Sequence, residues 1–296
     1  KINLFSSYDN NEDVFEASID AIKWSKWIFN KNYGAKFIMS FGIENRLSKI
    51  FKPESGKTVM LAVDHGYFQG PTTGLEDLRK TLAPLANLAD CLFITRGMLR
   101  NCVEKNIQSS ICLRVSGGPS ILGELSNEDI VVSLEEAIRL NVSGIGMSIF
   151  VGAENEDRTI SNLGRLINEA EKYGMPVLAI TAVGREMARD SRYLGLACRI
   201  AAEIGSRIVK TYYCEDFYKV VESCPVPIVM AGGTKIPEKD ALEMTENAIK
   251  EGASGVDMGR NIFQSENPAA MMKAIKAIVH NGADFKEAYE SYSQGS

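Results

Sequence analysis

Hydrophobic positions change their spacing repeatedly along the chain after Thr58. Short β-branched or leucine-rich runs alternate with longer segments in which apolar residues recur at helical spacing, and this alternation predicts parallel strands joined by helices. The predicted strands are Thr58–Asp64, Cys91–Thr95, Ile111–Val115, Gly144–Phe150, Pro176–Thr181, Arg207–Tyr213, Pro227–Gly233 and Gly255–Gly259. Segments with helical spacing include Leu75–Asn87, Leu134–Leu140, Ile160–Tyr173, Tyr193–Ile204, Lys239–Lys250 and Pro268–His280.

Eight predicted strands with helices between them favour the α/β fold of a (β/α)8 TIM barrel, a fold of about 250 residues. A doubly wound sheet is the weaker alternative. It would carry GxGxxG directly after an early strand, whereas the residues after Asp64 read HGYFQGPTTG, which lacks that spacing. The GxG of the predicted strand Gly144–Phe150 lies inside the strand and indicates close packing.

The domain organisation follows from the absence of any linker or low-complexity tract. We expect a single domain, with an N-terminal helical extension over residues 1–57 and the barrel over residues 58–296. Apolar and charged residues in the segment 12–30 follow an amphipathic helix pattern. The apolar face of that helix needs a partner, either the bottom of the barrel or a neighbouring subunit.

The overall composition is that of a globular protein, with 45% hydrophobic and 24% charged residues. The 33 Lys and Arg residues against 38 Asp and Glu give a net charge of −5, which argues against nucleic acid and membrane surfaces as partners. No apolar run approaches the ~18–20 residues of a membrane span, and the segment 1–11 has no signal-peptide core. The six cysteines lack CxxC spacing. We therefore expect a soluble cytoplasmic protein with reduced thiols.

Lys210 is the sharpest candidate for chemistry, because it lies at the end of the apolar predicted strand RIVK. In barrel enzymes, the C-terminal ends of the strands build the site. Burial and neighbouring cations would lower the pKa of this amine. A neutral amine can attack a ketone and form a Schiff base, which stabilises a carbanion at the neighbouring carbon. Alternatively, Lys210 reaches solvent at the edge or binds a phosphate.

Two further candidates follow the first predicted strand, in the sequence Asp64-His65. A carboxylate at the end of an apolar strand requires a cation, and Lys210 is a plausible partner that Asp64 would tune. The alternative is that Asp64 caps the next turn. His65 has a side chain that titrates near neutral pH and suits general acid or base catalysis, or else it orders the loop that follows.

A metal-dependent reaction is disfavoured by the histidine count. Zinc sites usually take about three protein ligands that are rich in histidine, and the chain has only His65 and His280. His280 lies at the end of the last predicted helix, where we expect it to face solvent. Covalent catalysis without a metal is therefore favoured.

Two glycine-containing loops follow the last two predicted strands, where many barrels bind phosphate through backbone N–H groups. Gly232 and Gly233 lie in the first loop, and Gly259 and Arg260 lie in the second. Arg260 would add a bidentate charge clamp, although glycines there also serve tight turns. Three residues remain open: Arg96 and Arg114, which end strands, and Cys214, for which no histidine is placed to activate the thiol.

With these residues in view, the sequence resembles the DhnA-type class I aldolase family. The resemblance runs from about residue 43 to residue 280. It rests on AVDHGYFQGPTTGLE (62–76), ELSNE (124–128), VKTYY (209–213), CPVPIVMAGG (224–233) and SGVDMGRNIFQSENP (254–268). It implies a (β/α)8 fold, a Schiff base on Lys210 in the sixth strand, and a supporting role for Asp64.

One departure from the family pattern bears on the reaction. Aldolases of this family carry a Tyr-Pro-Arg-Gly motif after the fifth strand, and the tyrosine donates a proton. Here the segment 181–186 reads TAVGRE, and this difference favours the thiolase branch, which also lacks that tyrosine. The resemblance then implies coenzyme A as co-substrate, a phosphorylated dione as substrate, Asp64 and His65 as proton carriers, and a homo-oligomer.

Two other functions stay open at this point. The first is a metal-independent class I aldolase that acts on a phosphorylated ketose such as fructose 1,6-bisphosphate. The second is a barrel that binds a sugar phosphate without catalysis. Dependence on coenzyme A distinguishes the thiolase from the aldolase, and covalent trapping on Lys210 distinguishes both enzymes from a binding protein.

Overall fold

The computed structural model describes residues 41–182 and 189–295 of the chain. Eight parallel strands close into a barrel in the order β1-β10-β9-β8-β7-β6-β3-β2, which confirms the predicted (β/α)8 fold. The barrel strands are β1 (Thr58–Ala62), β2 (Cys91–Thr95), β3 (Ser110–Arg114), β6 (Gly144–Ile149), β7 (Val177–Thr181), β8 (Ile208–Tyr212), β9 (Ile228–Ala231) and β10 (Gly255–Met258). A small antiparallel hairpin, β4 (Ser116–Gly117) and β5 (Asp129–Ile130), follows β3.

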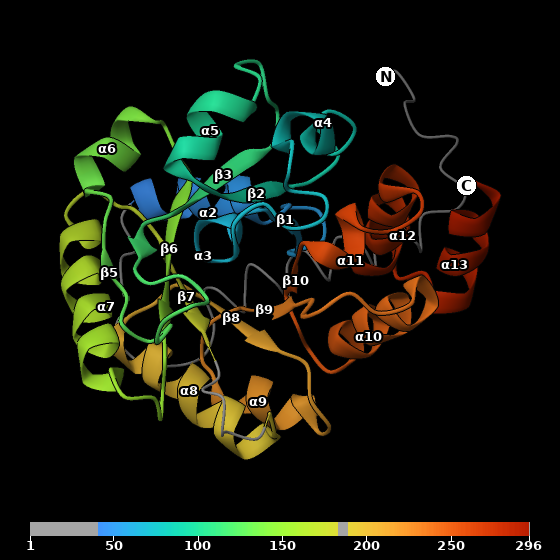
Figure 1. The fold of residues 1–296 in the computed structure, drawn as a ribbon. Coiled ribbons are helices and arrows are strands. Elements are labelled where there is room, and N and C mark those ends of the chain that lie inside the picture. Colours follow the sequence, from blue (N-terminus) through green and yellow to red (C-terminus); the bar gives the residue numbers. More distant parts are fainter. Residues whose placement is uncertain (1–40, 183–188, 296) are drawn as a thin grey trace, which may run out of the picture.

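Helices surround the strands, as Figure 1 shows in a view along the barrel. They are α2 (Phe41–Ile50), α3 (Gly66–Gln69), α4 (Leu78–Leu82), α5 (Arg96–Cys102), α6 (Leu134–Arg139), α7 (Glu156–Glu171), α8 (Ser191–Ile204), α9 (Phe217–Ser223), α10 (Glu238–Lys250), α11 (Arg260–Phe263), α12 (Pro268–Asn281) and α13 (Phe285–Gln294). In the described part of the chain, none of these helices combines the length and apolar character needed to cross a bilayer.

Local sequence signals account for the ends of the long helices. Asp190 caps α8 by accepting a 2.8 Å hydrogen bond from the backbone N–H of Tyr193, and Gly205 ends that helix with a left-handed φ of 114°. Asn267 caps α12 and accepts a bond from the N–H of Ala270. Side chains that cap the first turn and a glycine after the last one are the usual helix boundaries.

One predicted helix is much shorter in the structure, and some helices were not among the candidates. The predicted helix Leu75–Asn87 is only the short helix α4, because Pro84 lacks the N–H that would continue the hydrogen bonding beyond Leu82. The helices α5, α9 and α13 were not among the candidates, and α13 packs against α10 and α12. The amphipathic segment 12–30 lies outside the described residues.

The interior of the barrel is filled by inward-facing side chains near the N-terminal ends of the strands. These residues are Met60, Cys91, Phe93, Cys112, Leu178, Ile208 and Val229, and Ile50 and Phe51 at the end of α2 pack onto them. A Cβ atom on Gly144 would lie 3.0 Å from Ile50, and one on Gly146 would lie 2.6 Å from the ring of Phe93. The prediction that these glycines permit close packing is therefore confirmed.

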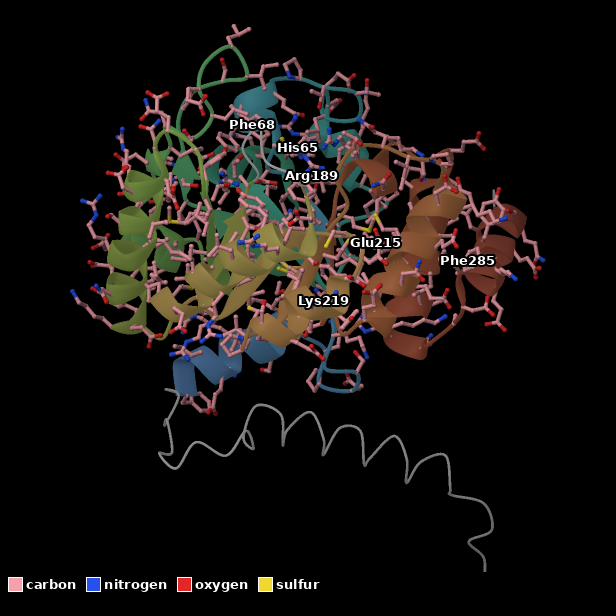
Figure 2. The ribbon with its side chains drawn as sticks, turned by 90° about the horizontal axis from the view of Figure 1, so that it is seen from below. His65, Phe68, Arg189, Glu215, Lys219 and Phe285 are labelled. Carbon is pink, nitrogen blue, oxygen red and sulfur yellow. The ribbon has the colours of Figure 1, made fainter. Side chains whose placement is uncertain are left out.

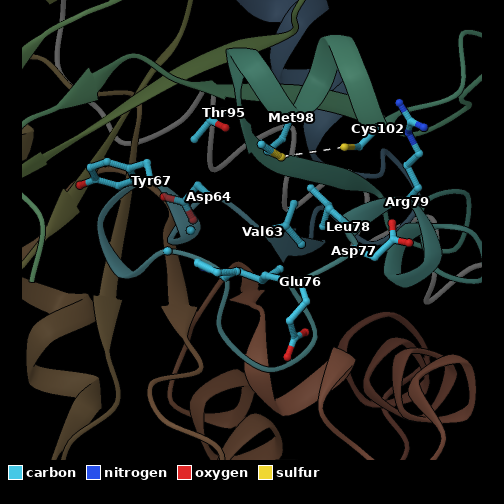
Figure 3. Close-up of a pocket in the computed structure, with 14 residues that line it drawn as sticks. Val63, Asp64, Tyr67, Glu76, Asp77, Leu78, Arg79, Thr95, Met98 and Cys102 are labelled. Atoms are coloured by element: carbon cyan, nitrogen blue, oxygen red, sulfur yellow. Dashed lines mark hydrogen bonds between the residues drawn. The ribbon is translucent and has the colours of Figure 1, made fainter.

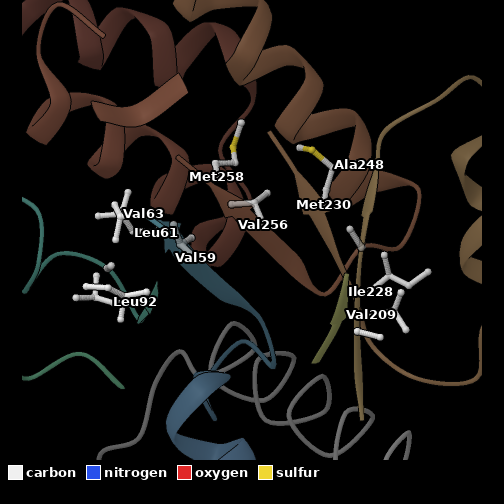
Figure 4. Packing of buried hydrophobic residues seen from close by; sticks show 14 of the residues in the cluster. Val59, Leu61, Val63, Leu92, Val209, Ile228, Met230, Ala248, Val256 and Met258 are labelled. Carbon is white, nitrogen blue, oxygen red and sulfur yellow. The ribbon is translucent and has the colours of Figure 1, made fainter. Parts of the chain in front are cut away.

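A second apolar layer lies between the strands and the surrounding helices. Outward-facing residues such as Val59, Leu61, Val209 and Val256 are fully buried there, and Figure 4 shows them with Ala248 of α10. This alternation of side chains, inward and then outward, is the two-residue period of a strand. It explains why polar residues at the last inward positions share one end of the barrel.

His280 does not face solvent as expected. Its Nε2 atom lies 2.7 Å from Oδ2 of the buried Asp90, and its Nδ1 atom lies 2.7 Å from the hydroxyl of Ser55. Lys276 donates a 2.8 Å bond to the same carboxylate. Burial alone would raise the pKa of Asp90, but the hydrogen bonds from His280, Lys276 and the backbone of Val59 outweigh it and hold the pKa low. The cluster joins α12 to the starts of β1 and β2.

Candidate active site

A cavity of about 400 Å³ opens at the C-terminal end of the barrel. Residues that end or follow seven of the barrel strands line it, and every residue proposed for the site from the sequence is among them: Asp64, His65, Lys210, Gly232, Gly233, Gly259 and Arg260. Figure 2 shows His65, Phe68 and Arg189, which also line the cavity, together at the end of the barrel opposite α2. The geometry thus unites residues that are spread over 197 positions from Asp64 to Arg260.

Lys210 lies in the cavity wall, and its partner is a carboxylate that the sequence analysis missed. Ile208, Lys210 and Tyr212 alternate inward on β8, and Asp257 points inward from β10. Lys210 Nζ lies 2.8 Å from Asp257 Oδ2, and the Asp257 side chain has no exposed surface. Within the described residues, Asp257 Oδ1 has no hydrogen-bond partner. The amine therefore faces one buried, otherwise unbonded carboxylate.

The charge state of Lys210 differs from the sequence-based expectation. Burial favours the neutral amine, but the negative charges of Asp257 and Asp64 outweigh it and raise the pKa of Lys210. The expected decrease was wrong because the nearest charges are carboxylates rather than cations. A raised pKa favours the ammonium form, which must lose a proton before it can attack a carbonyl. Asp257 is the adjacent acceptor, and burial raises the pKa of its carboxyl as well.

Asp64 forms its ion pair with Arg114 and not with Lys210 as proposed, although its negative charge does raise the pKa of Lys210. Arg114 is buried, and its Nη1 atom donates a 3.2 Å bond to Asp64 Oδ2. Its Nη2 atom donates to Glu128 at 2.8 Å, to the hydroxyl of Ser148 at 2.7 Å and to that of Tyr67 at 2.6 Å. The hydroxyl of Tyr67 also bonds Glu128. This buried charge cluster fixes the Asp64 carboxylate against the cavity.

His65 is held in the cavity as a neutral imidazole. Its ring stacks on Phe263 with centroids 5.7 Å apart, and its buried Nε2 atom has no hydrogen-bond partner within the described residues. Burial is the main cause that lowers the pKa of His65 to about 4; the charges of Arg260 and Lys210 add to it, and Asp64 opposes it. An uncharged imidazole with an unbonded ring nitrogen can form a hydrogen bond to a substrate near neutral pH.

The two glycine loops form one continuous wall of the cavity. Gly233 adopts a left-handed φ of 69° beside open space, and a Cβ atom on Gly259 would lie 2.3 Å from the carbonyl oxygen of Ala62. Asn261 ties the loops together. Its side-chain amide donates a 2.6 Å bond to the Gly232 carbonyl and accepts a 2.9 Å bond from the N–H of Ile236. Asn261 was not identified from the sequence, because nothing in its local pattern shows a cross-loop bond.

The residues left open by the sequence divide into two groups. Arg114 lines the cavity, whereas Arg96 and Cys214 are not among its lining residues. Cys214 is buried, and burial together with the charge of Glu251 raises the pKa of its thiol to about 11. Arg189, which the sequence analysis did not consider, lines the rim and lies 3.9 Å above the ring of Tyr212. Most of the segment TAVGRE, residues 183–186, lies outside the described residues.

Metal-ligating side chains do not gather anywhere in the described part of the chain. No group of three or more His, Cys, Asp or Glu residues there is placed to hold an ion.

Relatives with named activities resemble this chain over most of its length. It is 53% identical over 257 residues to the 3-hydroxy-5-phosphonooxypentane-2,4-dione thiolase of Enterobacter sp., an alignment that covers 86% of this chain and 87% of that protein. The thiolase of the same name from Escherichia coli strain K12 is 53% identical, with coverage of 86% and 88%. An uncharacterized aldolase of Pasteurella multocida is 50% identical over 285 residues, with coverage of 96% and 97%.

Solved structures resemble the fold. An archaeal fructose 1,6-bisphosphate aldolase superposes with a TM-score of 0.72 at 26% identity, over 81% of this chain and all of that one. A further archaeal aldolase structure, described as having its catalytic lysine bound to the carbinolamine intermediate of the substrate, gives 0.73 at 27% identity, over 80% and 99%. The family model for DeoC/LacD aldolases matches residues 58–265. This protein is a member of the DeoC/LacD aldolase family.

Proposed function

We propose that this protein catalyses the coenzyme A-dependent cleavage of 3-hydroxy-5-phosphonooxypentane-2,4-dione to dihydroxyacetone phosphate and acetyl-CoA. The observation that carries the proposal is the buried Lys210–Asp257 pair, at 2.8 Å, in the wall of the barrel cavity. The activity itself is taken from the relatives at 53% identity that bear this thiolase name.

The first step uses Lys210 and Asp257. Asp257 takes the ammonium proton, and the neutral amine of Lys210 attacks the ketone beside the phosphonooxymethyl group. Loss of water from the resulting carbinolamine gives a protonated Schiff base, which attracts electrons from the neighbouring C–C bond. Because Asp257 has no competing hydrogen bond among the described residues, it can return the proton to the departing hydroxide.

The second step is acyl transfer to coenzyme A, the co-substrate. The thiolate adds to the acetyl carbonyl, and the bond between that carbonyl carbon and the hydroxylated carbon breaks. The released electron pair forms an enamine on Lys210, and acetyl-CoA leaves. Asp64 and His65 would accept the thiol proton and return one to the enamine carbon, and water then hydrolyses the Schiff base. Both side chains line the cavity that contains Lys210.

The phosphate of the substrate would lie against the two glycine loops. Backbone N–H groups of Gly232, Gly233 and Gly259 and the guanidinium of Arg260 are the groups proposed to bind it. These residues follow β9 and β10, and β9 pairs with β8, the strand that carries Lys210. A substrate with its phosphate there would present its ketone to the amine. We further propose a cytoplasmic homo-oligomer, whose subunit number size-exclusion chromatography with light scattering would determine.

The test combines covalent trapping with turnover. Sodium borohydride and dihydroxyacetone phosphate should add one ligand mass to the wild type, and peptide mapping should place it on Lys210. The dione should be consumed only with coenzyme A present. A Lys210→Ala variant should lose trapping and turnover, whereas the control Lys219→Ala, with an exposed side chain outside the cavity, should keep both.

Three results would contradict the proposal, each in a different way. Full turnover by Lys210→Ala would exclude the Schiff base. Cleavage of fructose 1,6-bisphosphate without a thiol, and no consumption of the dione, would favour the aldolase alternative. No covalent adduct in the folded protein would favour a barrel that only binds a sugar phosphate.

A further inference from the structure

A second cavity, of about 530 Å³, lies beside the candidate active site. It is bounded by the segment after β1, by α4, and by the end of β2 with α5. Asp64 and Tyr67 line both this hollow and the barrel cavity, so these two side chains form a shared wall. The hollow is shown in Figure 3.

The lining of this side hollow is mostly apolar. It includes Val63, Leu75, Leu78, Met98 and Cys102. Met98 is nevertheless 42% exposed, so an apolar residue faces solvent directly beside a polar site. A slot of this size, apolar with a few polar groups, is typical of a site for part of a small molecule.

The two sides of the hollow differ in chemistry. Figure 3 shows Asp64 and Tyr67 on one side and Arg79 and Cys102 on the other. At the outer side, the exposed Arg79 donates to the carbonyl of Asn101, and the carboxylate of Asp77 lies near Lys80. The outer charges are therefore mixed. The inner side instead ends at a carboxylate that faces the reaction cavity.

We propose that this side hollow holds the pantetheine arm of coenzyme A, with its thiol at the Asp64–Tyr67 wall. The inference rests on the proposed function, which requires a thiol to reach the acetyl carbonyl of a substrate held by Lys210. The phosphate loops follow β9 and β10, and the side hollow opens by β1 and β2, of which β1 is the neighbour of β10 in the closed barrel. The arm is long, thin and uncharged, and it therefore suits an apolar slot more than a highly charged one.

The same geometry gives Asp64 a defined task. Its carboxylate is fixed by Arg114 and borders both cavities, so it is placed to accept the proton that the thiol loses as it attacks. The proton then lies next to His65 and the reaction cavity, from which the enamine carbon can be protonated.

Filling the hollow tests the inference by kinetics. Met98→Trp adds bulk from an exposed position, so the fold should tolerate it. We expect the KM for coenzyme A to increase at least tenfold, with unchanged borohydride trapping of dihydroxyacetone phosphate on Lys210. The matched control is Leu196→Trp, whose side chain is 53% exposed on α8 and lines neither cavity. An unchanged KM in folded Met98→Trp would overturn the inference.

Chemical labelling tests the same hollow without turnover. Cys102 lies in its lining and is partly exposed, whereas the other five cysteines are buried. Acetyl-CoA and desulfo-coenzyme A, which lack a free thiol, should slow alkylation of Cys102 by N-ethylmaleimide severalfold at saturation, and ADP should not. Labelling at an unchanged rate with both ligands would overturn the inference even if the dione is cleaved. Protection without any cleavage would instead refute the proposed function and support the binding site.

Discussion

Lys210 Nζ lies 2.8 Å from Asp257 Oδ2, across the barrel interior between β8 and β10. The strand β9 separates these two strands, so the pair is made by side chains that point inward and not by neighbouring backbones. Asp257 is fully buried and has no hydrogen bond to any other group among the described residues. Lys210 is thus the cation that compensates the buried Asp257 carboxylate, and the negative charge of Asp257 in turn stabilises the ammonium form of Lys210.

Replacing Asp257 by Asn should therefore lower the pKa of Lys210, because burial would then act against the ammonium with less opposition. The pH dependence of Lys210 acylation by a water-soluble reagent, followed by peptide mass spectrometry, measures this shift. We also expect kcat to decrease about 100-fold, the usual effect of losing a general acid–base group. Asp216→Asn, at an exposed ion pair, should change neither quantity. An unchanged Lys210 titration in Asp257→Asn would contradict the assignment.

His65 should make the stability of the protein depend on pH in a defined window. Its pKa is about 4 in the folded protein and 6.5 when unperturbed, so between these values the unfolded chain binds a proton that the folded chain does not. The neutral imidazole should therefore make its full contribution to the free energy of unfolding above pH 6.5. This contribution, about 3 kcal/mol, should be lost as the pH falls to 4. Urea unfolding of wild type and His65→Gln at pH 7 and pH 4.5 measures it. Equal losses in both proteins would contradict the burial of a neutral imidazole.

The sequence predicted the barrel and the residues at its mouth because both depend on local patterns. The strand period places Lys210 inward, and the position after a strand places Asp64 and Arg260 at the C-terminal end of the barrel. Asp257 lies inside the predicted strand Gly255–Gly259. Because residues two positions apart in a strand share a face, Asp257 lies on the same face as Gly255 and Gly259, and this spacing is the only sign in the sequence of an inward carboxylate. That spacing could have identified it.

The pairing of charges could not be predicted in the same way. Arg114 forms ion pairs with Asp64 and Glu128 because the closed barrel and the hairpin β4–β5 bring those side chains together. Lys210 and Asp257 are likewise joined only by barrel closure. His280 lies near the end of a helix, where a side chain is ordinarily exposed. It is instead partly buried because the buried carboxylate of Asp90 requires hydrogen-bond donors, and His280 is one of them.

Arg114 should contribute strongly to stability. Arg114→Met would leave the carboxylates of Asp64 and Glu128 buried without their cation, and loss of one partner from a buried ion pair costs about 3–5 kcal/mol. Arg158→Met is the matched control, since Arg158 pairs with Asp129 where both side chains are exposed, and it should cost less than about 1 kcal/mol. Urea unfolding at pH 7 measures both. Similar losses in the two variants would show that the Arg114 cluster does not act as a buried charge network.

Asn261 should affect binding of the phosphorylated substrate without touching it. Asn261→Ala removes the amide that joins the two glycine loops and leaves the half-buried Gly232 carbonyl and Ile236 N–H without this partner, a loss of about 1 kcal/mol. Part of that loss should loosen the phosphate-binding wall and increase the KM for the substrate about tenfold, whereas kcat should change by less than threefold because Lys210 and Asp257 stay in place. Steady-state kinetics measures both constants, and Asn45→Ala on the exposed surface of α2 is the control. If kcat falls and KM is constant, Asn261 supports the reacting groups rather than the phosphate loops.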